Sequence, residues 1–323
     1  MKKRIMSCFM ALALCLTLLP TAALAAEHTD HCICGKTKHA DIGNHASQQN
    51  AFGDTAKELG KNSNNELTKG GQSWTTKTAN FYNGSEQHTG YLLETGAYYL
   101  SADLELTSPI IIIGDVKLCL NGYSITCKGT ECAMNVYADD SQCLTLTDCK
   151  TTGKGKIICS NGTVVDIRSG KTFNMYDGTI TGASGEGGVR IDSGCTFNMY
   201  GGTITNNKSC GVYMSAGKFN MYGGEITKNN RGVDVGRTEP VFSVSGKATI
   251  TGNGKEGKAE NVYLNGDRTI HVTGKFTGTI GVTTAEPPTR SAPIKVAGAV
   301  ANFSDYITSD QTGYEVKYDS SQG

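Results

Sequence analysis

Short segments in which every second residue is apolar recur along the middle of the chain, with turn residues between them. The clearest copies are the Phe-Asn-Met-Tyr segments Phe173–Tyr176, Phe197–Tyr200 and Phe219–Tyr222, followed by a degenerate copy at Phe242–Ser245. Their first residues are 24, 22 and 23 positions apart. An apolar period of two is typical of strands with one buried face, so the pattern predicts a repeat built from short strands.

Each repeat contains two other short strands. One follows the Phe segment, at Thr179–Thr181, Thr203–Thr205, Glu225–Thr227 and Thr249–Thr251, and one precedes it, at Val164–Ile167, Val189–Ile191, Val212–Met214 and Val233–Val235. Three strands and three turns fit one coil of a parallel β-helix. A leucine-rich repeat would need a leucine and asparagine consensus that does not occur here, and a propeller blade needs nearly twice the length. The sequence therefore predicts an all-β fold, a right-handed parallel β-helix solenoid.

Less regular coils extend the repeat on both sides. We expect Leu118 and Leu144 in the Phe column before the clear copies and Ile270 after them, which gives about seven coils from roughly Gly90 to Val282. Stacking of coil on coil would bury Phe, Met, Ile and Val inside the tube. Three asparagines recur at one corner, where a left-handed backbone and a side-chain ladder are expected. They are Asn207, Asn229 and Asn253.

The chain divides into four regions. Residues 1–26 are predicted to be a signal peptide, 27–75 a short irregular region with Cys, His and a linker, 76–282 the β-helix, and 283–323 a cap or a lead-in to a further domain. The polar stretch 47–77 is expected to be a linker or a weakly helical cap anchored by Trp74. In the tail, Pro287 and Pro288 end the coil pattern, and strands are expected near Ile294–Ala297 and Tyr314–Tyr318.

The N-terminus has the features of an export signal. Basic residues Lys2–Arg4 precede a mostly apolar stretch, Ile5–Leu19, and a small-residue site, Ala23–Ala25. This order is typical of a cleaved signal, so we expect cleavage after Ala25 or Ala26 and a secreted or cell-surface protein. No later apolar segment approaches the roughly eighteen residues that span a bilayer, so no transmembrane segment is expected after signal cleavage.

Composition narrows the possible partners. Removal of the signal changes the formal charge from 30 minus 30 to 27 minus 30, which indicates neither nucleic acid nor an anionic membrane as a partner. Glycine occurs 41 times in 323 residues, which suits short strands and tight turns. The oligomeric state is left open.

Ten of the twelve cysteines lie outside the signal, because Cys8 and Cys15 belong to it. An exported chain can form disulfides, although an anaerobic habitat would leave thiols. Cys127 and Cys159 occupy equivalent positions in neighbouring coils if Ile125 aligns with Ile157. This pair is the preferred disulfide, with buried thiols as the alternative.

Several stretches resemble secreted right-handed β-helix proteins of Gram-positive gut bacteria, within the pectin-lyase-like group. The stretches that carry the resemblance are Gly96–Leu100, Val116–Gly122, the Phe-Asn-Met-Tyr-Gly-Gly-Thr-Ile-Thr copies and Asn261–Leu264. The resemblance as a whole extends over about two thirds of the chain. The resemblance implies a β-helix, commonly part of a larger surface protein. The wider group includes pectate lyases, polygalacturonases, epimerases, phage tailspikes, adhesins and surface-layer components, so the resemblance does not select an activity.

Outward positions on one strand face form two adjacent columns. One contains Asn135, Asp166, Arg190, Tyr213, Asp234 and Tyr263, and the other contains Tyr137, Arg168, Asp192, Ser215, Gly236 and Asn265. Asp166 with Arg190, and Arg168 with Asp192, are expected as charge pairs across the rungs, which set register and solubility.

The same columns carry the enzyme hypothesis. A glycosidase places two carboxylates about 5 or about 6.5 to 9.5 Å apart, and strand spacing puts the backbones of Asp166 and Asp192 roughly 8 Å apart. The candidate catalytic residues are Asp166, Arg190, Asp192 and Asp234. Against catalysis, Asp166 and Asp192 each face an arginine, and the Gly-His-Gly and Arg-Ile-Lys motifs of polygalacturonases do not occur. The adjacent pair Asp139 and Asp140 is expected in a turn away from this face.

A second face carries the candidate ligand-binding residues. They are Tyr176, Tyr200 and Tyr222 in one column and Asn174, Asn198 and Asn220 beside it. Aromatic rings can form a flat platform for sugar rings, and amides can bond hydroxyl groups. Alternatively, consecutive rings stack on one another and only stabilise the coil. If this surface binds a ligand, an extended glycan fits its geometry.

The predicted mature N-terminus holds a cluster of possible zinc ligands within eighteen residues, namely His28, His31, Cys32, Cys34, His39 and His45. Cysteine and histidine suit Zn²⁺, so a zinc ion is the one cofactor that the sequence suggests. A Cys-x-Cys pair is less specific than paired Cys-x-x-Cys sets, so a disulfide to another cysteine is the alternative.

Three functions remain open on these observations. The preferred hypothesis is a non-catalytic secreted or cell-surface module for polysaccharide binding or adhesion, because an export signal and Tyr and Asn ladders occur without a complete catalytic set. The alternatives are a polysaccharide lyase or glycoside hydrolase acting on the solenoid face, and a structural spacer.

Overall fold

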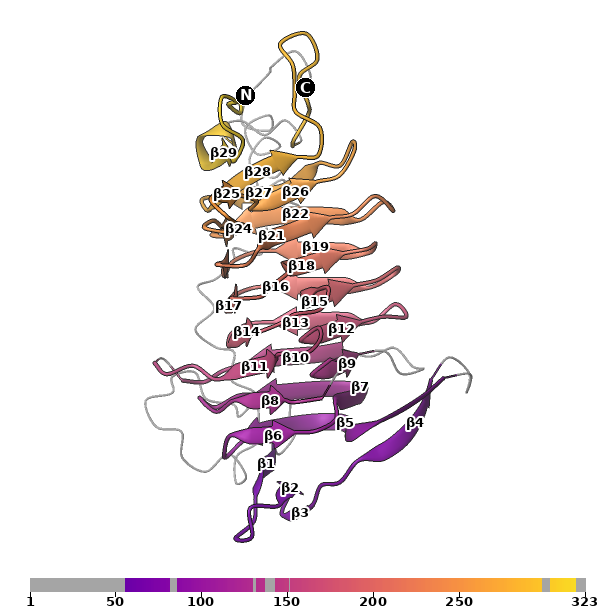
Figure 1. The fold of residues 1–323 in the computed structure, drawn as a ribbon. Helices are drawn as coiled ribbons and strands as arrows, with labels where there is room; N and C mark the ends of the chain where they lie inside the picture. Colours follow the sequence, from indigo (N-terminus) through magenta and orange to yellow (C-terminus); the bar gives the residue numbers. More distant parts are fainter. Residues whose placement is uncertain are drawn as a thin grey trace, which may run out of the picture.

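The computed structural model describes residues 56–81, 86–129, 132–136, 143–150, 152–297 and 303–317. They form a parallel β-solenoid of about eight turns with essentially no helix, stacked along one axis (Figure 1). The predicted all-β parallel β-helix is therefore confirmed, with about one turn more than expected. In the described part of the chain, no helix has the length and apolarity needed to cross a bilayer. The predicted signal peptide lies outside the described residues.

Three stacks of parallel strands build the tube. After β5 (Glu86–Leu100), the first stack contains β7 (Ile110–Cys119), β10 (Cys143–Thr147), β13 (Thr172–Met175), β16 (Thr196–Met199), β19 (Lys218–Met221), β22 (Val241–Gly246) and β27 (Ile270–Phe276). The second contains β6 (Leu104–Leu106), β8 (Ile125–Cys127), β11 (Lys156–Cys159), β14 (Thr179–Thr181), β17 (Thr203–Thr205), β20 (Glu225–Thr227), β23 (Thr249–Ile250) and β28 (Thr279–Thr284). The third contains β9 (Met134–Val136), β12 (Val165–Ile167), β15 (Gly187–Ile191), β18 (Cys210–Met214), β21 (Arg231–Val235) and β26 (Val262–Leu264).

The phenylalanine column lies inside the tube, as the repeat predicts. Phe173, Phe197, Phe219 and Phe242 pair in register and are fully buried. Their rings stack with successive centroids 4.9, 4.8 and 5.1 Å apart, close to the spacing of adjacent strands. Each coil thus completes its core only by stacking on its neighbours.

One residue of the extended column is displaced by two positions. Leu144 and Ile270 take their predicted places, but Val116, not Leu118, pairs with Leu144. Leu118 pairs with Leu146 in the neighbouring methionine column and is still fully buried. A slip of two residues keeps every side chain on its own face, so the apolar pattern does not distinguish the two registers.

Strands replace the linker or weak helix expected before the solenoid. β1 (Lys57–Lys61) pairs in parallel with β5, and β2 (Leu67–Lys69) and β3 (Gln72–Ser73) extend it in antiparallel fashion. The expected anchor Trp74 is only 5% exposed, and its ring centroid lies 5.2 Å from that of Tyr91. Its indole N–H donates to the carbonyl oxygen of Leu92 at 3.2 Å, so the ring is both packed and satisfied.

The described part of the tail covers the last coil with a short strand and a 3₁₀ turn that the sequence did not predict. β29 (Ile307–Ser309) pairs with β28 and adds Ile307 to the buried isoleucine column. The 3₁₀ turn η2 (Phe303–Tyr306) places Phe303 edge-on against Phe276, at 5.2 Å between centroids. The two strands expected in the tail are wrong for the described residues, since Ala297 makes only an isolated bridge and 314–317 contain no strand.

The asparagine ladder at the corner between the second and third stacks is present. Asn207, Asn229 and Asn253 are buried, and the side-chain oxygen of each later asparagine accepts both the backbone and side-chain N–H of the one before. The ladder continues through Asn261 to the carboxylate of Asp310, at 2.7 Å for both bonds. The left-handed residues are not these asparagines but their predecessors, Asn206, Lys228 and Gly252.

Candidate functional site

The tyrosine column lies on the outside of the first stack, next to the asparagine column of the same strands. The rings of Tyr176 and Tyr200 are 4.6 Å apart and 7° from parallel, and those of Tyr200 and Tyr222 are 4.9 Å apart and 13° from parallel. The rings therefore cover one another's faces, so the stacking alternative describes the geometry along the column. Between the two end rings, the column therefore presents ring edges and hydroxyl groups to a ligand.

The asparagine column beside these rings forms an open ladder. The Nδ2 of Asn198 donates to Asn174 Oδ1 at 2.8 Å, and the Nδ2 of Asn220 donates to Asn198 Oδ1 at 2.9 Å. A primary amide has two N–H donors and two acceptor lone pairs, so each rung keeps capacity for a ligand. Burial, with the neighbouring phenols Tyr176 and Tyr222, raises the pKa of Tyr200 to about 12, so its hydroxyl stays protonated at neutral pH.

On the third stack, the two predicted columns are in register. Asp166 lies between Asn135 and Arg190, and the column continues through Tyr213, Asp234 and Tyr263. Tyr137, Asp139 and Asp140 lie outside the described residues.

The shortest ion pairs on these columns run along the strands, while the charge of Arg168 also acts on Asp192 across the rung, as expected. Asp166 pairs with Arg168 at 2.7 Å, and Arg190 pairs with Asp192 at 3.3 Å and with Glu186 at 2.9 Å. The expected pair of Asp166 with Arg190 is therefore wrong. An arginine side chain reaches a carboxylate two residues along its own strand as easily as one on the next rung, so column position does not determine the partner.

The candidate catalytic carboxylates are all held by cations or donors. Burial by itself would raise the pKa of Asp192. That pKa is nevertheless held below its ordinary value by the Ser215 hydroxyl at 2.9 Å, by the Ser193 amide and by the charges of Arg190 and Arg168. Asp234 pairs with Arg231 and accepts from Asn265 at 2.8 Å.

A glycosidase also needs a carboxyl group that stays protonated, and Asp192 does not meet that need. Burial raises the pKa of Asp148, but its oxygens accept the backbone N–H groups of Gly122, Lys150 and Gly155. Asp148 thus orders a turn at another corner of the coil.

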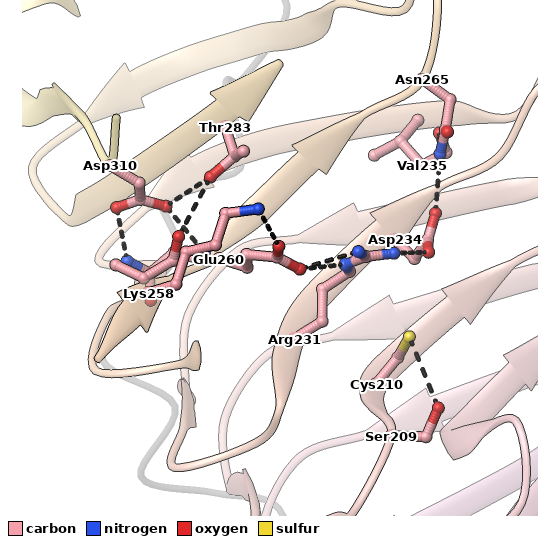
Figure 2. A network of polar contacts seen from close by, with 12 residues as sticks. Ser209, Cys210, Arg231, Asp234, Val235, Lys258, Glu260, Asn265, Thr283 and Asp310 are labelled. Carbon is pink, nitrogen blue, oxygen red and sulfur yellow. Dashed lines mark hydrogen bonds and ion pairs between the residues drawn. The ribbon is translucent and has the colours of Figure 1, made fainter. Parts of the chain in front are cut away.

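Arg231 is the centre of a polar network that the repeat pattern did not single out (Figure 2). Its guanidinium pairs with Asp234 and with Glu260, the latter at 2.7 Å, and lies 3.9 Å from the ring centroid of Tyr263. Lys258 also pairs with Glu260, at 3.1 Å. Burial by itself would raise the pKa of Glu260, but hydrogen bonds from Arg231 and Lys258 hold that pKa below its ordinary value.

A pocket of about 400 Å³ opens beside this network. It is lined by Lys208, Ser209, Cys210, Asn230, Arg231, Lys255, Lys258 and Glu260. The hairpin of β24 (Gly254–Lys255) and β25 (Lys258–Ala259) forms one side. In the sequence, the hairpin corresponds to a lengthened connection between the ladder residue Asn253 and the core residue Val262.

The predicted zinc ligands His28, His31, Cys32, Cys34, His39 and His45 lie outside the described residues, so this site stays a prediction. Within the described ranges, no group of three or more His, Cys, Asp or Glu side chains could hold a metal.

Cys127 and Cys159 are aligned in register and fully buried, as thiols that hydrogen-bond to each other. Their disulfide stays a prediction. A second buried pair, not singled out from the sequence, brings the sulfurs of Cys119 and Cys149 within 3.4 Å.

Comparison of the chain with family models, with curated proteins and with solved structures finds no match in any of the three. The β-solenoid fold therefore rests on the chain's own strand register. The resemblance to secreted β-helix proteins of gut bacteria stays a prediction.

Proposed function

We propose that this protein is a non-catalytic module, secreted or on the cell surface, that binds an extended polysaccharide along its Asn and Tyr columns. The observation that carries the proposal is the repeat of identical polar rungs along the tube axis. Asn side chains are linked at 2.8 and 2.9 Å, and Tyr rings follow at 4.6 and 4.9 Å. A polymer that repeats its hydroxyl groups matches a surface that repeats its donors and acceptors.

The stacked rings determine the expected mode of binding. Because the ring faces are occupied, the polymer would contact ring edges, phenol hydroxyls and the remaining N–H groups of the Asn ladder. The state of the carboxylates supports a module without catalysis, since Asp192 and Asp234 are held by donors and cations. An enzyme on this face would need another acid.

The test replaces Tyr176, Tyr200 and Tyr222 together by Phe, which keeps the stack and removes three hydroxyl groups. Each lost hydrogen bond is worth roughly 1 kcal/mol, so affinity for a glycan found on an array should fall at least about tenfold. The control is Tyr314→Phe, because Tyr314 is exposed and lies beyond β29 at the end of the solenoid, outside the column. Failure of the wild-type chain to bind any glycan would end the proposal.

A structural spacer is the second candidate, and the mutual stacking of the tyrosines favours it. Rings that only stabilise the coil would leave glycan binding absent or unchanged in the Phe variant. Release of reducing ends or unsaturated uronates from a polysaccharide would instead support the enzyme alternative.

A further inference from the structure

We propose a second ligand site, at the corner between the second and third stacks, that binds a tetrahedral oxyanion group such as a sulfate or phosphate ester. The pocket of about 400 Å³ beside Arg231 forms this site. It lies on a different corner from the Asn and Tyr columns, so it does not depend on the polysaccharide proposal.

The first observation is an insertion that the solenoid does not need. The chain passes from the ladder asparagine to the next core valine in five residues from Asn207 to Val212 and in four from Asn229 to Val233. From Asn253 to Val262 it takes nine, and the extra residues form the β24–β25 hairpin at the side of the tube (Figure 1). Insertions in repeat proteins map to loops on one face, often the binding face.

The second observation is the charge of the lining. Four cations, Lys208, Arg231, Lys255 and Lys258, face the pocket with one carboxylate, Glu260. Arg231 and Lys258 both pair with Glu260, so the lining of the pocket has more positive charges than negative ones. Arg231 is fixed by Glu260 on one side and Asp234 on the other, so its guanidinium has a set orientation at the edge of the pocket, and the uncompensated positive charge comes from the lysines (Figure 2).

The three lysines are available to a ligand. The exposed ammonium of Lys208 has no acidic partner within the described ranges. The side chains of Lys255 and Lys258, which pair with Glu256 and Glu260, are 66% and 71% exposed, so both ammonium groups are largely hydrated. Such pairs contribute about 1 kcal/mol or less, so both ammonium groups can turn towards an anion.

The set of donors favours a tetrahedral oxyanion over a carboxylate. Ammonium groups come from two turns, and the amide of Asn230 comes from a third turn of the same corner. A sulfate or phosphate ester offers three strong acceptor oxygens, whereas a carboxylate has only two. Burial raises the pKa of the Cys210 thiol to about 12, so the thiol adds no negative charge to the pocket at neutral pH.

The test compares heparin with chemically desulfated heparin, and inorganic phosphate with sulfate, in titrations of the full chain. Lys208, Lys255 and Lys258 are replaced by Ala in one variant, and the exposed Lys156, Lys247 and Lys275, outside the pocket, in a control with the same change of charge. The pocket variant should lose at least about tenfold in affinity for heparin and the control less than about twofold. Desulfation should cost the wild-type chain at least about tenfold.

The phosphate and sulfate titrations identify which ester the site prefers, and both must compete with heparin. Lys208→Ala alone should lower affinity in a chain whose circular dichroism is unchanged. If the two triple lysine variants lose equal affinity for heparin, the attraction is a general effect of charge. If the wild-type chain binds desulfated heparin as tightly as heparin, the site binds carboxylates. Either result, or no binding of any probe, overturns the proposal. The variant with Tyr176, Tyr200 and Tyr222 changed to Phe should keep this binding.

Discussion

At the scale of single residues, Glu260 is the carboxylate on which the polar network depends. Its side chain is 15% exposed, and it accepts from Arg231 and Lys258. An ionised carboxylate in this position is stabilised by two cations, and because Arg231 and Glu260 are both largely buried, the loss of Arg231 would be costly. The folded state therefore binds a proton at Glu260 less readily than the unfolded chain, whose ordinary pKa is 4.5.

This difference predicts how stability depends on pH. Because the folded pKa of Glu260 is lowered, its contribution to the free energy of unfolding is fully present above pH 4.5 and is lost as pH falls through the folded value. In urea titrations between pH 6 and pH 3, Glu260→Gln should lose stability less steeply than wild type. Glu256→Gln, whose side chain is 82% exposed, is the control and should follow the wild-type curve. Parallel curves for all three would contradict the assignment.

At the scale of strands and turns, the period-two pattern and the spacing of the repeats were enough to place every strand of the four regular coils. The Asp166 column was also predictable, because outward positions follow once inward ones are known. The register of Leu118 was not predictable, because Leu118 is buried in both of the registers that differ by two residues. The edge strands β1 and β29 lack repeat partners in the sequence, so nothing in the apolar pattern marked them.

Like the strands, some candidate sites were predictable from the sequence and others were not. The Tyr and Asn columns were visible because each repeats one residue type along consecutive strands. The sequence does not determine whether these rings stack on one another, because it does not show whether a ring faces its neighbour or a ligand. The network around Arg231 joins turns 29 residues apart, and its carboxylate comes from an insertion. A departure from the repeat was the only sequence signal for it.

At the turns, Asn229 links its coil to both neighbouring coils by side-chain hydrogen bonds. Its Oδ1 accepts from Asn207 Nδ2 at 2.8 Å, while its Nδ2 donates to Asn253 Oδ1 at 2.9 Å and to the carbonyl oxygen of Ile204 at 3.0 Å. The side chain is 1% exposed, so water does not replace these partners when the amide is removed.

Asn229→Ala should therefore lower the free energy of unfolding by about 3 kcal/mol, the cost of leaving buried donors and acceptors unpaired. The matched control is Asn161→Ala, because Asn161 is exposed and makes one bond of 3.3 Å to the carbonyl oxygen of Lys128. Its change should stay within about 0.5 kcal/mol. Urea unfolding followed by circular dichroism measures both, and equal losses would mean that the ladder adds nothing specific.

At the scale of the whole molecule, the solenoid is held by contacts between neighbouring coils. The Phe and Tyr stacks and both Asn ladders repeat from rung to rung, and the segments around Trp74 and Phe303 cover the two ends. In such a protein, stability is approximately a sum of coil and interface contributions. An internal coil is therefore removable, provided that the ends of the cut fall at equivalent positions.

Deletion of residues 197–218 tests this. The 22 residues separate two aligned phenylalanines, so Thr196 would be followed by Phe219 in the same register. Phe219 would then stack on Phe173, Tyr222 on Tyr176, and Asn229 Oδ1 would accept the N–H of Ala183 that Asn207 now accepts. We expect a folded β protein with one cooperative thermal transition. Deletion of residues 197–207 alone breaks the period, so it should abolish that transition. If both deletions unfold the chain, stability does not arise from interchangeable neighbouring coils.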